Sequence, residues 1–385
     1  MTSEWRTIRA ADFIDFNPRL SLKKGDIATK VAMDKLKPFT KKIPETEKAE
    51  FNGGAKFCNG DTVMARITPC LENGKTAYVD MLDDGEIGFG STEFIVMRAK
   101  TGISDPQFVY YTAINPVFRN VAIKSMVGSS GRQRVQQSVL EELELSVPNL
   151  DEQRRIGAFL AGLDEKIALN NRINDNLLAQ AQTLYKQFFP YGVQDDLPDG
   201  WRIGTVGEII EIHDSKRIPL SGADRTKMEK KIYPYYGAAS LMDFVDNYIF
   251  DGKYLLLGED GTVVDDAGYP ILQYVWGQFW VNNHAHILTG RLGYDVESLY
   301  MLFKQTPVKS IVTGAVQPKI SQANLRSVQV VIPPEHNLRE YNGLVEPLFS
   351  LFRANEEECK TFTALRDTLL PKLMSGEIDV SAVQL

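Results

Sequence analysis

The sequence predicts two α/β (α+β) domains in tandem, each followed by one long helix. Three observations predict this arrangement. The chain has 385 residues, enough for two or three domains. A shift of 185 residues places the hydrophobic pattern of the first half on that of the second. Each half also ends in a long segment whose apolar residues have helical spacing, at 151–188 and 336–374. These observations together indicate a pseudo-two-fold internal repeat.

The repeat is clearest at the end of each half, where it runs without a gap. Val135 then falls on Ile320, and Pro148 falls on Pro333. Upstream, the match persists with small changes of offset, so that 57–60 resembles 249–252. Self-similarity over this length is typical of a duplicated unit. We therefore expect two similar domains at 1–148 and 191–333, with helical segments at 149–190 and 334–385.

Short apolar runs separated by Gly, Asn and Asp predict strands between turns in both domains. In the first domain the expected strands are 62–67, 76–79, 93–98 and 143–148. Their counterparts in the second domain are 254–257, 271–275, 285–288 and 328–333. Helical stretches are expected at 105–124 and 296–313.

The segment 151–188 has the 4,3 spacing of a coiled-coil seam. Its apolar seam positions are Ile156, Leu160, Leu163, Ile167, Leu177, Ala181, Leu184 and Phe188. Asn170 and Asn174 fall on this seam, and Asn355 falls on the seam of 336–374. A buried asparagine fixes the register of such a pair. The alternative is that two unrelated amphipathic helices each pack on their own domain.

Two similar domains separated by helices of fixed length can act as a ruler. About 35 helical residues span roughly 50 Å. One turn of B-DNA is about 34–36 Å, and paired readers occupy half-sites at that repeat or its multiples. Because the two halves have diverged, the chain would read an asymmetric, bipartite site rather than a palindrome.

The composition is that of an ordinary globular protein, with a net charge of −7. No apolar run is long enough for a membrane helix. The N-terminus lacks a secretion signal and the three cysteines are scattered, which predicts a cytoplasmic protein without a disulfide framework or zinc site. Positive charge is nevertheless concentrated locally. Segment 19–42 has eight basic and two acidic residues, and segment 214–231 has six and three.

The candidate DNA-binding residues are basic or amide side chains in loops of the two halves. Glycines in the loop 128–134 allow close backbone approach, and Arg and Gln can make bidentate contacts with guanine and adenine edges. An ordinary solvated surface is the alternative for each of them. Four lysines are expected to contact phosphates: Lys35, Lys37, Lys41 and Lys42. Such contacts position the protein on DNA but do not specify the base sequence. The other candidates are Arg66, Thr68, Lys75, Ser129, Ser130, Arg132, Gln133, Arg134, Gln137, Lys216, Arg217, Arg225, Gln317, Lys319 and Gln322.

Segments 147–156, 163–167 and 184–189 resemble the central conserved region of specificity (S) subunits of type I restriction–modification systems. Segment 370–378 resembles the second conserved region of these subunits, and Leu-Pro-Asp-Gly-Trp at 197–201 resembles the opening of their second half. The resemblance implies two target-recognition domains that read a split DNA site, spaced by an antiparallel coiled coil. It also implies that the chain catalyses nothing.

The same resemblance implies partners. Methylation (M) subunits, two of them, dock on the helices and use S-adenosylmethionine. Restriction (R) subunits use ATP and Mg²⁺, so that the assembled complex is an adenine DNA methyltransferase and ATP-dependent endonuclease. One departure is that Asn337-Leu338-Arg339 replaces Glu152-Gln153-Arg154 in the second half. The residues expected to bind partners are Gln153, Arg154, Leu163, Ile167, Asn170, Leu348, Phe352 and Asn355.

The sequence contains no complete enzyme motif, which argues against a fused nuclease or methyltransferase. The P-loop glycine that should precede Gly74-Lys75-Thr76 is Pro69, and Asn17-Pro18 lacks the rest of a methyltransferase motif. His284 and His286 would share one face of a strand and could bind a metal. A structural or DNA-facing role is the favoured interpretation of this pair. We expect no metal or cofactor on this chain. The other rival is a coiled-coil adaptor that binds proteins and no DNA.

Overall fold

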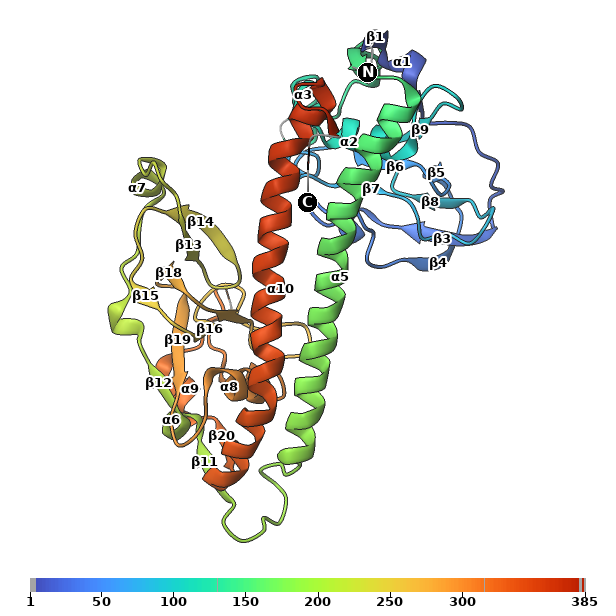
Figure 1. Ribbon diagram of the computed structural model, residues 1–385. Coiled ribbons are helices and arrows are strands. Elements are labelled where there is room, and N and C mark those ends of the chain that lie inside the picture. Colours follow the sequence, from blue (N-terminus) through green and yellow to red (C-terminus); the bar gives the residue numbers. More distant parts are fainter. Residues whose placement is uncertain (1–4, 130, 315, 381–382, 384–385) are drawn as a thin grey trace. The chain divides into compact units, whose positions relative to one another are not determined.

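The structure is a computed structural model that describes residues 5–129, 131–314, 316–380 and 383. It divides into two compact units. Unit 1 comprises Met1–Arg172 and Asn355–Leu385, and unit 2 comprises Ile173–Ala354. Each unit contains part of both long helices, α5 (Leu150–Phe188) and α10 (Glu335–Ser375), which are green and red in Figure 1.

Unit 1 has two four-stranded sheets and a two-stranded ribbon within its described residues. The first sheet is antiparallel, in the order β2-β9-β6-β7. The second has the order β4-β3-β8-β5, and its β3–β8 pair is parallel. The ribbon pairs β1 with β10. The strands are β1 (Arg6–Arg9), β2 (Ile14–Phe16), β3 (Ile27–Val31), β4 (Glu47–Glu50), β5 (Ala55–Phe57), β6 (Thr62–Ala65), β7 (Thr76–Tyr78), β8 (Gly88–Gly90), β9 (Phe94–Ala99) and β10 (Glu144–Val147).

Unit 2 repeats this topology strand for strand. Its sheets have the orders β12-β19-β16-β17 and β14-β13-β18-β15, and its ribbon pairs β11 with β20. The parallel pair, β13–β18, occupies the same place in the sheet as in unit 1. The strands are β11 (Arg202–Thr205), β12 (Ile210–Ile212), β13 (Tyr233–Tyr236), β14 (Leu241–Val245), β15 (Phe250–Asp251), β16 (Tyr254–Gly258), β17 (Leu272–Val275), β18 (Gln278–Val281), β19 (Ala285–Gly290) and β20 (Gln329–Ile332). The predicted duplication is confirmed.

Among the shorter helices, α1, α2 and α4 of unit 1 correspond to α6, α8 and α9 of unit 2, and two stretches differ from the sequence prediction. The stretch 105–124 is two helices, because Asn115 caps the second one through Val117 N and Pro116 begins it. The stretch 296–313 is helical only to Phe303 and then at 309–311. The helices are α1 (Ala10–Phe13), α2 (Pro106–Ile114), α3 (Pro116–Lys124), α4 (Gln137–Glu141), α6 (Val206–Ile209), α7 (Gly222–Thr226), α8 (Val296–Phe303) and α9 (Gln322–Ser327), with 3-10 turns η1 (Met33–Lys35), η2 (Asp214–Lys216) and η3 (Lys309–Ile311).

The long helices run in opposite directions within each unit, as the coiled-coil prediction requires. In unit 1, Arg366 pairs with Asp164 at 2.6 Å, and Asn170 Nδ2 donates to Glu358 at 2.6 Å. In unit 2, Tyr341 Oη donates to the carbonyl of Ala181 at 3.2 Å. The seam asparagines are buried, at 7% exposure for Asn170, 3% for Asn174 and 9% for Asn355. No helix among the described residues is long and apolar enough to cross a membrane.

Each sheet domain is attached to the helix pair by a buried core and an ion-pair cluster. In unit 1 the core joins Phe13 and Phe108 to Leu160 of α5 and Leu373 of α10. Asp164 accepts a hydrogen bond from Tyr111 Oη at 2.5 Å in addition to its ion pair with Arg366. Each partner therefore satisfies the charge that the other brings into the interior.

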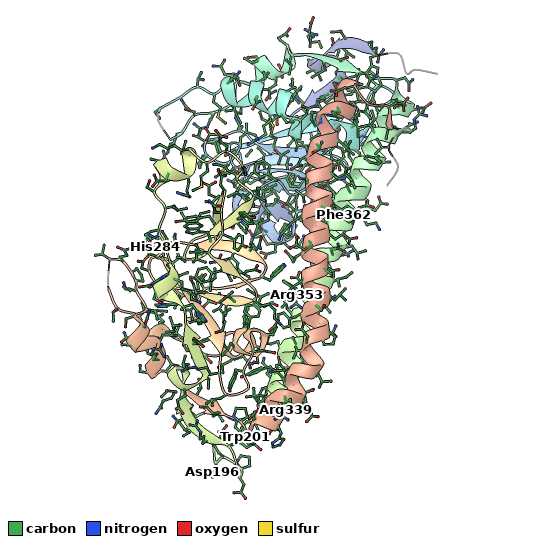
Figure 2. All side chains as sticks on the ribbon, turned by 60° about the vertical axis from the view of Figure 1, so that its left-hand side comes forward. Asp196, Trp201, His284, Arg339, Arg353 and Phe362 are labelled. Carbon is green, nitrogen blue, oxygen red and sulfur yellow. The ribbon has the colours of Figure 1, made fainter. Side chains whose placement is uncertain are left out.

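Unit 2 has a corresponding ion-pair cluster on α10. Arg353, labelled in Figure 2, contacts Tyr274 Oη at 2.6 Å and Glu297 at 3.1 Å. Lys253 also binds Glu297, at 2.6 Å. The side chain of Glu297 is 1% exposed, so these two cations compensate a carboxylate that water does not reach.

Lys41 is part of the unit 1 attachment, and its expected phosphate contact is wrong. The residue is only 5% exposed, and its ammonium group lies against the rings of Tyr78, Tyr110 and Tyr111. Burial lowers the pKa of Lys41 to about 8. A phosphate at the surface cannot reach this ammonium group.

Candidate nucleic-acid interface

In unit 1, the basic loop after α3 closes against the ends of β6 and β9. The amide of Val135 donates to the carbonyl of Arg66 at 2.8 Å, and Thr68 exchanges two hydrogen bonds with the backbone of Gln133. Arg134 pairs with Val127 across the loop. The structure therefore brings together Arg66, Thr68, Gln133 and Arg134, which the sequence predicted only as separate loop candidates.

Arg134 is held by Glu93, the residue before β9. Its Nε lies 2.9 and 3.0 Å from the two carboxylate oxygens, and Nη2 lies 2.6 Å from Oε1. The hydrogen bonds from Arg134 lower the pKa of Glu93 below its ordinary value. This bidentate pair fixes the guanidinium group at the base of the loop, with its side chain 46% exposed.

Asn17 joins the loop to the first sheet, and sequence reasoning assigned it no such role. It follows β2 with a left-handed backbone, at φ 50°. Its Oδ1 accepts from the amide of Val96 at 2.9 Å, and its Nδ2 donates to Gln137 Oε1 at 2.6 Å. Gln137, the first residue of α4, in turn donates to Glu141 at 2.7 Å. The turn signal Asn-Pro at 17–18 is the feature that could have identified this residue.

Unit 2 has the same backbone framework with different side chains. The amide of Glu259 donates to the carbonyl of His284 at 2.8 Å, as that of Arg66 does to Glu93. The amide of Ile320 donates to the carbonyl of Glu259 at 2.8 Å, as that of Val135 does to Arg66. The framework therefore makes Glu259 the counterpart of Arg66, and Lys319 the counterpart of Arg134.

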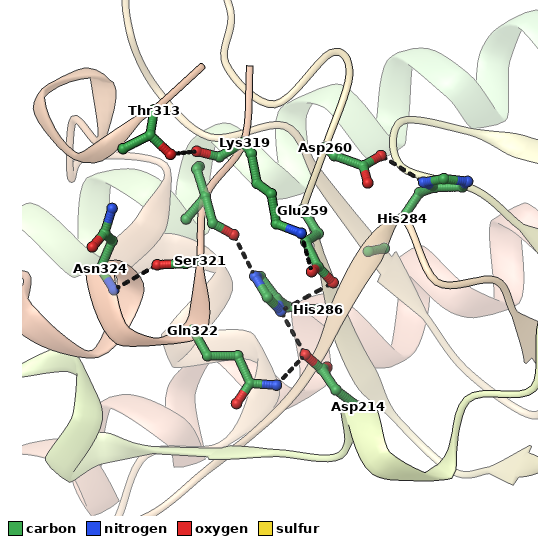
Figure 3. Close-up of polar contacts among 12 residues, drawn as sticks. Asp214, Glu259, Asp260, His284, His286, Thr313, Lys319, Ser321, Gln322 and Asn324 are labelled. Atoms are coloured by element: carbon green, nitrogen blue, oxygen red, sulfur yellow. Dashed lines mark hydrogen bonds and ion pairs between the residues drawn. The ribbon is translucent and has the colours of Figure 1, made fainter. Parts of the chain in front are cut away.

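Asp214 is the centre of the unit 2 cluster, drawn in Figure 3. Its carboxylate accepts from Gln322 Nε2 at 2.7 Å and from the amide of Ile287 at 3.0 Å, and it lies 2.6 Å from His286 Nδ1. Burial raises the pKa of Asp214, but the hydrogen bonds from His286 and Ile287 outweigh burial, and the pKa lies below its ordinary value. Asp214 is therefore a buried carboxylate that acts only as an acceptor.

His286 is fully buried and uses both ring nitrogens. Nε2 lies 2.8 Å from the carbonyl of Ile320, which can only accept a hydrogen bond. Since the Asp214 carboxylate also only accepts, each ring nitrogen of His286 faces an acceptor. His286 thus connects the end of the 313–320 loop to Asp214 (Figure 3).

Glu259 is neutralised by two cations. Arg217 Nη1 lies 2.6 Å from its Oε2, and Lys319 Nζ lies 3.2 Å from its Oε1. Asp214, Glu259 and His286 offer ligand atoms within 4.8 Å of one another, a spacing that a metal ion could use. Arg217 and Lys319 already satisfy Glu259, however, and His286 has no free nitrogen. We therefore interpret the group as an ion-pair network.

The remaining loop candidates lie at exposed positions or are used within the chain. Ser129, Arg132, Gln317, Lys37 and Lys216 are exposed. Ser130 lies outside the described residues. Lys75 Nζ donates to the carbonyl of Met33 at 2.9 Å, and Lys35 is paired with Glu45.

Arg217 and Arg225 belong to the interior of unit 2 more than to its surface. Their side chains are 13% and 17% exposed. Arg225 lies over the ring of Tyr235, 4.9 Å from its centroid, and bonds to Asp243. A DNA contact by either residue remains a prediction, and it would require the side chain to leave these partners.

Several residues expected to bind partner subunits are buried inside unit 1. Gln153 is 0% exposed, and its amide bonds to the backbone of Asp105, Ile103 and Pro148. Leu163, Asn170 and Asn355 are also buried, because the seam of one helix faces the other. A direct partner contact by these four side chains does not fit the structure. Arg154 is exposed beside Asp151, whereas Ile167, Leu348 and Phe352 are half-buried, and their partner contacts remain predictions.

Duplicated α/β domains on an antiparallel helix pair, with polar loop clusters at equivalent positions, define a tandem recognition-domain protein. A model of the type I restriction modification DNA specificity domain matches residues 3–179 and 198–340. The chain therefore belongs to the family of type I restriction–modification DNA specificity subunits.

Individual relatives agree with this family. The type I restriction enzyme MjaIX specificity subunit of Methanocaldococcus jannaschii is 22% identical over 290 residues, which cover 67% of this chain and 66% of that protein. The MjaVIII specificity subunit of the same organism is 20% identical over 98% of this chain and 93% of its own length. The S subunit structure from M. genitalium shares the fold, with a TM-score of 0.55 at 18% identity and 96% coverage of both chains. The chain thus spans about two thirds of the first relative and most of the second.

Proposed function

We propose that the chain reads a split, asymmetric DNA site, with one half-site assigned to the sheet domain of each unit. One observation carries this proposal. The two domains hold their loops on the same backbone hydrogen bonds, yet present Arg66 and Arg134 in one and Glu259 and Lys319 in the other. A common scaffold with different polar side chains is what two readers of different sequences need.

The chemistry of the two loops supports different half-sites. Arg132 and Gln133 are loop residues of unit 1, where arginine can donate to guanine O6 and N7 and glutamine can pair with adenine. The loop of unit 2 contains Gln317. Beside this loop, His284 Nδ1 lies 2.5 Å from Asp260 Oδ1. A carboxylate accepts from cytosine N4, so the second domain has an acceptor where the first has donors.

We further propose that the chain works without catalysis of its own, in the cytoplasm, as part of an assembly. Two methylation subunits would bring S-adenosylmethionine, and restriction subunits would bring ATP and Mg²⁺. Membership in the specificity family supports these partners. The surface for docking them would be formed by exposed residues of α5 and α10 such as Arg154, since the seam residues are occupied within the helix pair.

Methylome sequencing of cells with and without the gene tests the central proposal. Loss of the gene should remove adenine methylation from one bipartite motif. Arg132→Ala and Arg134→Ala should relax or weaken one half-site only, by about 1–3 kcal/mol if they read bases. An unchanged methylation pattern in the assembled complex would reject base reading by this loop.

A filter-binding assay separates DNA reading from the adaptor alternative. The purified full chain should retain random duplex at low salt, because phosphate contacts are independent of sequence. Absence of retention would favour a chain whose helices bind proteins and whose domains bind no DNA.

The length of the helix pair is proposed to set the gap between half-sites. Inserting one heptad after Arg172 in α5 and one after Ala354 in α10 keeps the seam in register. The insertion should lengthen the unread gap by roughly 10 Å, or about 3 base pairs. A methylated motif with an unaltered gap would show that the helices do not act as a ruler.

A further inference from the structure

Unit 1 has an open pocket of about 600 Å³ beside its loop cluster. The volume falls within the range of about 300–1,000 Å³ that is usual for small-molecule and cofactor sites. Leu20, Ala55, Phe94 and Val96 form apolar parts of its wall. Gly54 completes the wall with a backbone that only glycine accepts, because a Cβ there would lie 2.0 Å from the carbonyl oxygen of Gly90.

Among the residues that the structure describes, three cations and no carboxylate line the pocket. Arg19, Lys56 and Arg66 are all part of the lining, together with Asn17 and Thr92. The chain as a whole has a net charge of −7, so a cavity with basic residues alone stands out from the average surface. Such a cavity attracts an anion through its local field.

The cations of the pocket are incompletely satisfied within the described residues. Lys56 Nζ donates to the carbonyl of Leu20 and lies over the ring of Phe51, but forms no ion pair among the described residues. Arg66 makes one long hydrogen bond, from Nη2 to the carbonyl of Val135 at 3.4 Å, and its buried Nε has no partner. A buried donor without an acceptor is costly, and an anion in the pocket would supply one.

The counterpart of Arg66 in unit 2 shows how the same position is satisfied without a ligand. Glu259 there is bound by Arg217 and Lys319 of its own chain. In unit 1, Glu93 is engaged in a bidentate pair with Arg134 and is not part of the pocket lining. Among the described residues no acceptor faces Arg66 Nε, and an anion in the pocket would supply one.

We propose that this pocket receives one nucleotide of the bound DNA, with its phosphate held by Arg19, Lys56 and Arg66. The inference rests on the proposed DNA-reading function and adds a site to it. The volume exceeds the needs of a phosphate alone, and the apolar wall suits the adjoining sugar or base. The contact positions the duplex on the first domain and carries no sequence information by itself.

The test uses the full chain and a duplex that contains the methylated motif. Arg19→Gln and Lys56→Gln should each weaken binding and reduce the slope of log K against log salt by about 0.9, the value for one phosphate contact. Lys24→Gln is the matched control, because Lys24 is exposed, lies outside the pocket lining and involves the same loss of charge. Arg66→Gln also removes the buried Nε donor, and it should likewise weaken binding and reduce the slope.

Ethylation interference then locates the phosphate. One phosphate in the half-site of the first domain should block binding when ethylated, and this interference should vanish in Arg19→Gln. The inference is overturned if the pocket variants change the slope no more than Lys24→Gln does. It is also overturned if the chain binds free deoxynucleotide or inorganic phosphate in a way that saturating duplex does not displace. If the unmodified chain retains no duplex at all, the DNA-reading function itself fails.

Discussion

The residue that directly follows β6 in unit 1 and β16 in unit 2 differs in charge between the two units, although the backbone hydrogen bonds around it are the same. In unit 1, Arg66 follows β6 and faces a basic pocket. In unit 2, Glu259 follows β16 and is enclosed by Arg217 and Lys319. The backbone hydrogen bonds that hold the loop do not depend on these side chains. Duplication therefore preserved the scaffold and left the polar chemistry free to diverge.

The two units also differ in polar character at the neighbouring inner strand. In unit 1, the side chain of Asn17 accepts a hydrogen bond from a backbone amide of the inner strand β9. In unit 2, the side chain of Asp214 accepts the corresponding bond from β19. The strand position beside it is Ile95 in the first unit and His286 in the second, both fully buried. Unit 1 thus has a neutral amide over an apolar core, whereas unit 2 has a buried carboxylate bonded to a buried histidine. Such a pair is costly to break, because the partner that is left behind loses its hydrogen bond in the interior.

Removing the central side chain should show the largest difference between the units. Asp214→Ala removes the buried carboxylate that bonds His286 and Gln322, and it should cost about 3–5 kcal/mol in the free energy of unfolding. Asn17→Ala removes two neutral hydrogen bonds and should cost about 1–2 kcal/mol. Denaturant unfolding of the two variants provides the comparison. Equal losses would mean that the Asp214 network contributes no more than an amide does.

Converting the unit 2 cluster to the unit 1 pattern should reveal coupling. Asp214→Asn and His286→Ile each break the pair from one side. The double variant has the neutral combination of Asn17 and Ile95, and should be less destabilised than the sum of the single variants by about 1–3 kcal/mol. A double-mutant cycle measures this term. Additive effects would show that Asp214 and His286 are not energetically coupled.

Acid should weaken unit 2 through the same carboxylates. The pKa values of Asp214 and Glu259 lie below their ordinary values of 3.8 and 4.5. Their stabilising contribution is therefore complete above about pH 4.5 and is lost as the pH falls through the lowered values. The native chain should lose on the order of 1 kcal/mol more than the Asp214→Asn/His286→Ile variant between pH 6 and 3. Unfolding curves at both pH values test this, and equal losses would exclude Asp214 as the titrating group.

The long helices and most strands followed from periodicity, because hydrophobic spacing records which face is buried. The expected helix 151–188 is α5 at Leu150–Phe188, and the expected 336–374 is α10 at Glu335–Ser375. The candidate interface could be predicted from the sequence only in part. Arg134 and Gln137 were identified, but Glu93 and Asn17, which hold them, lie 41 and 120 residues away in sequence. Pairings over such distances depend on strand order, which periodicity does not encode.

Seam residues show a second limit. Heptad spacing placed Leu163 and Asn170 on the seam, and both are buried there, with Asn170 bonded to Glu358 of α10, whereas the resemblance had assigned them to partner binding. Gln153 was assigned to partner binding from a resemblance and is instead buried against the backbone at Ile103 and Pro148. Its counterpart, Leu338, is equally buried and apolar. The Glu-Gln-Arg difference between the halves therefore reflects packing at this position.

The smallest expected effect concerns the salt bridge that restrains Arg134. Glu93→Gln weakens a partly exposed pair and should change the free energy of unfolding by about 0.5 kcal/mol. It also removes a negative charge beside the basic pocket and frees the guanidinium group for phosphate. DNA affinity at low salt should therefore rise, with a steeper salt dependence. Glu72→Gln has the same change of charge at an exposed position and serves as the control in the anisotropy measurement. If Glu93→Gln instead lowers affinity while the fold is retained, then Arg134 acts in the orientation that Glu93 imposes, and the pair itself belongs to the reading surface of the first domain.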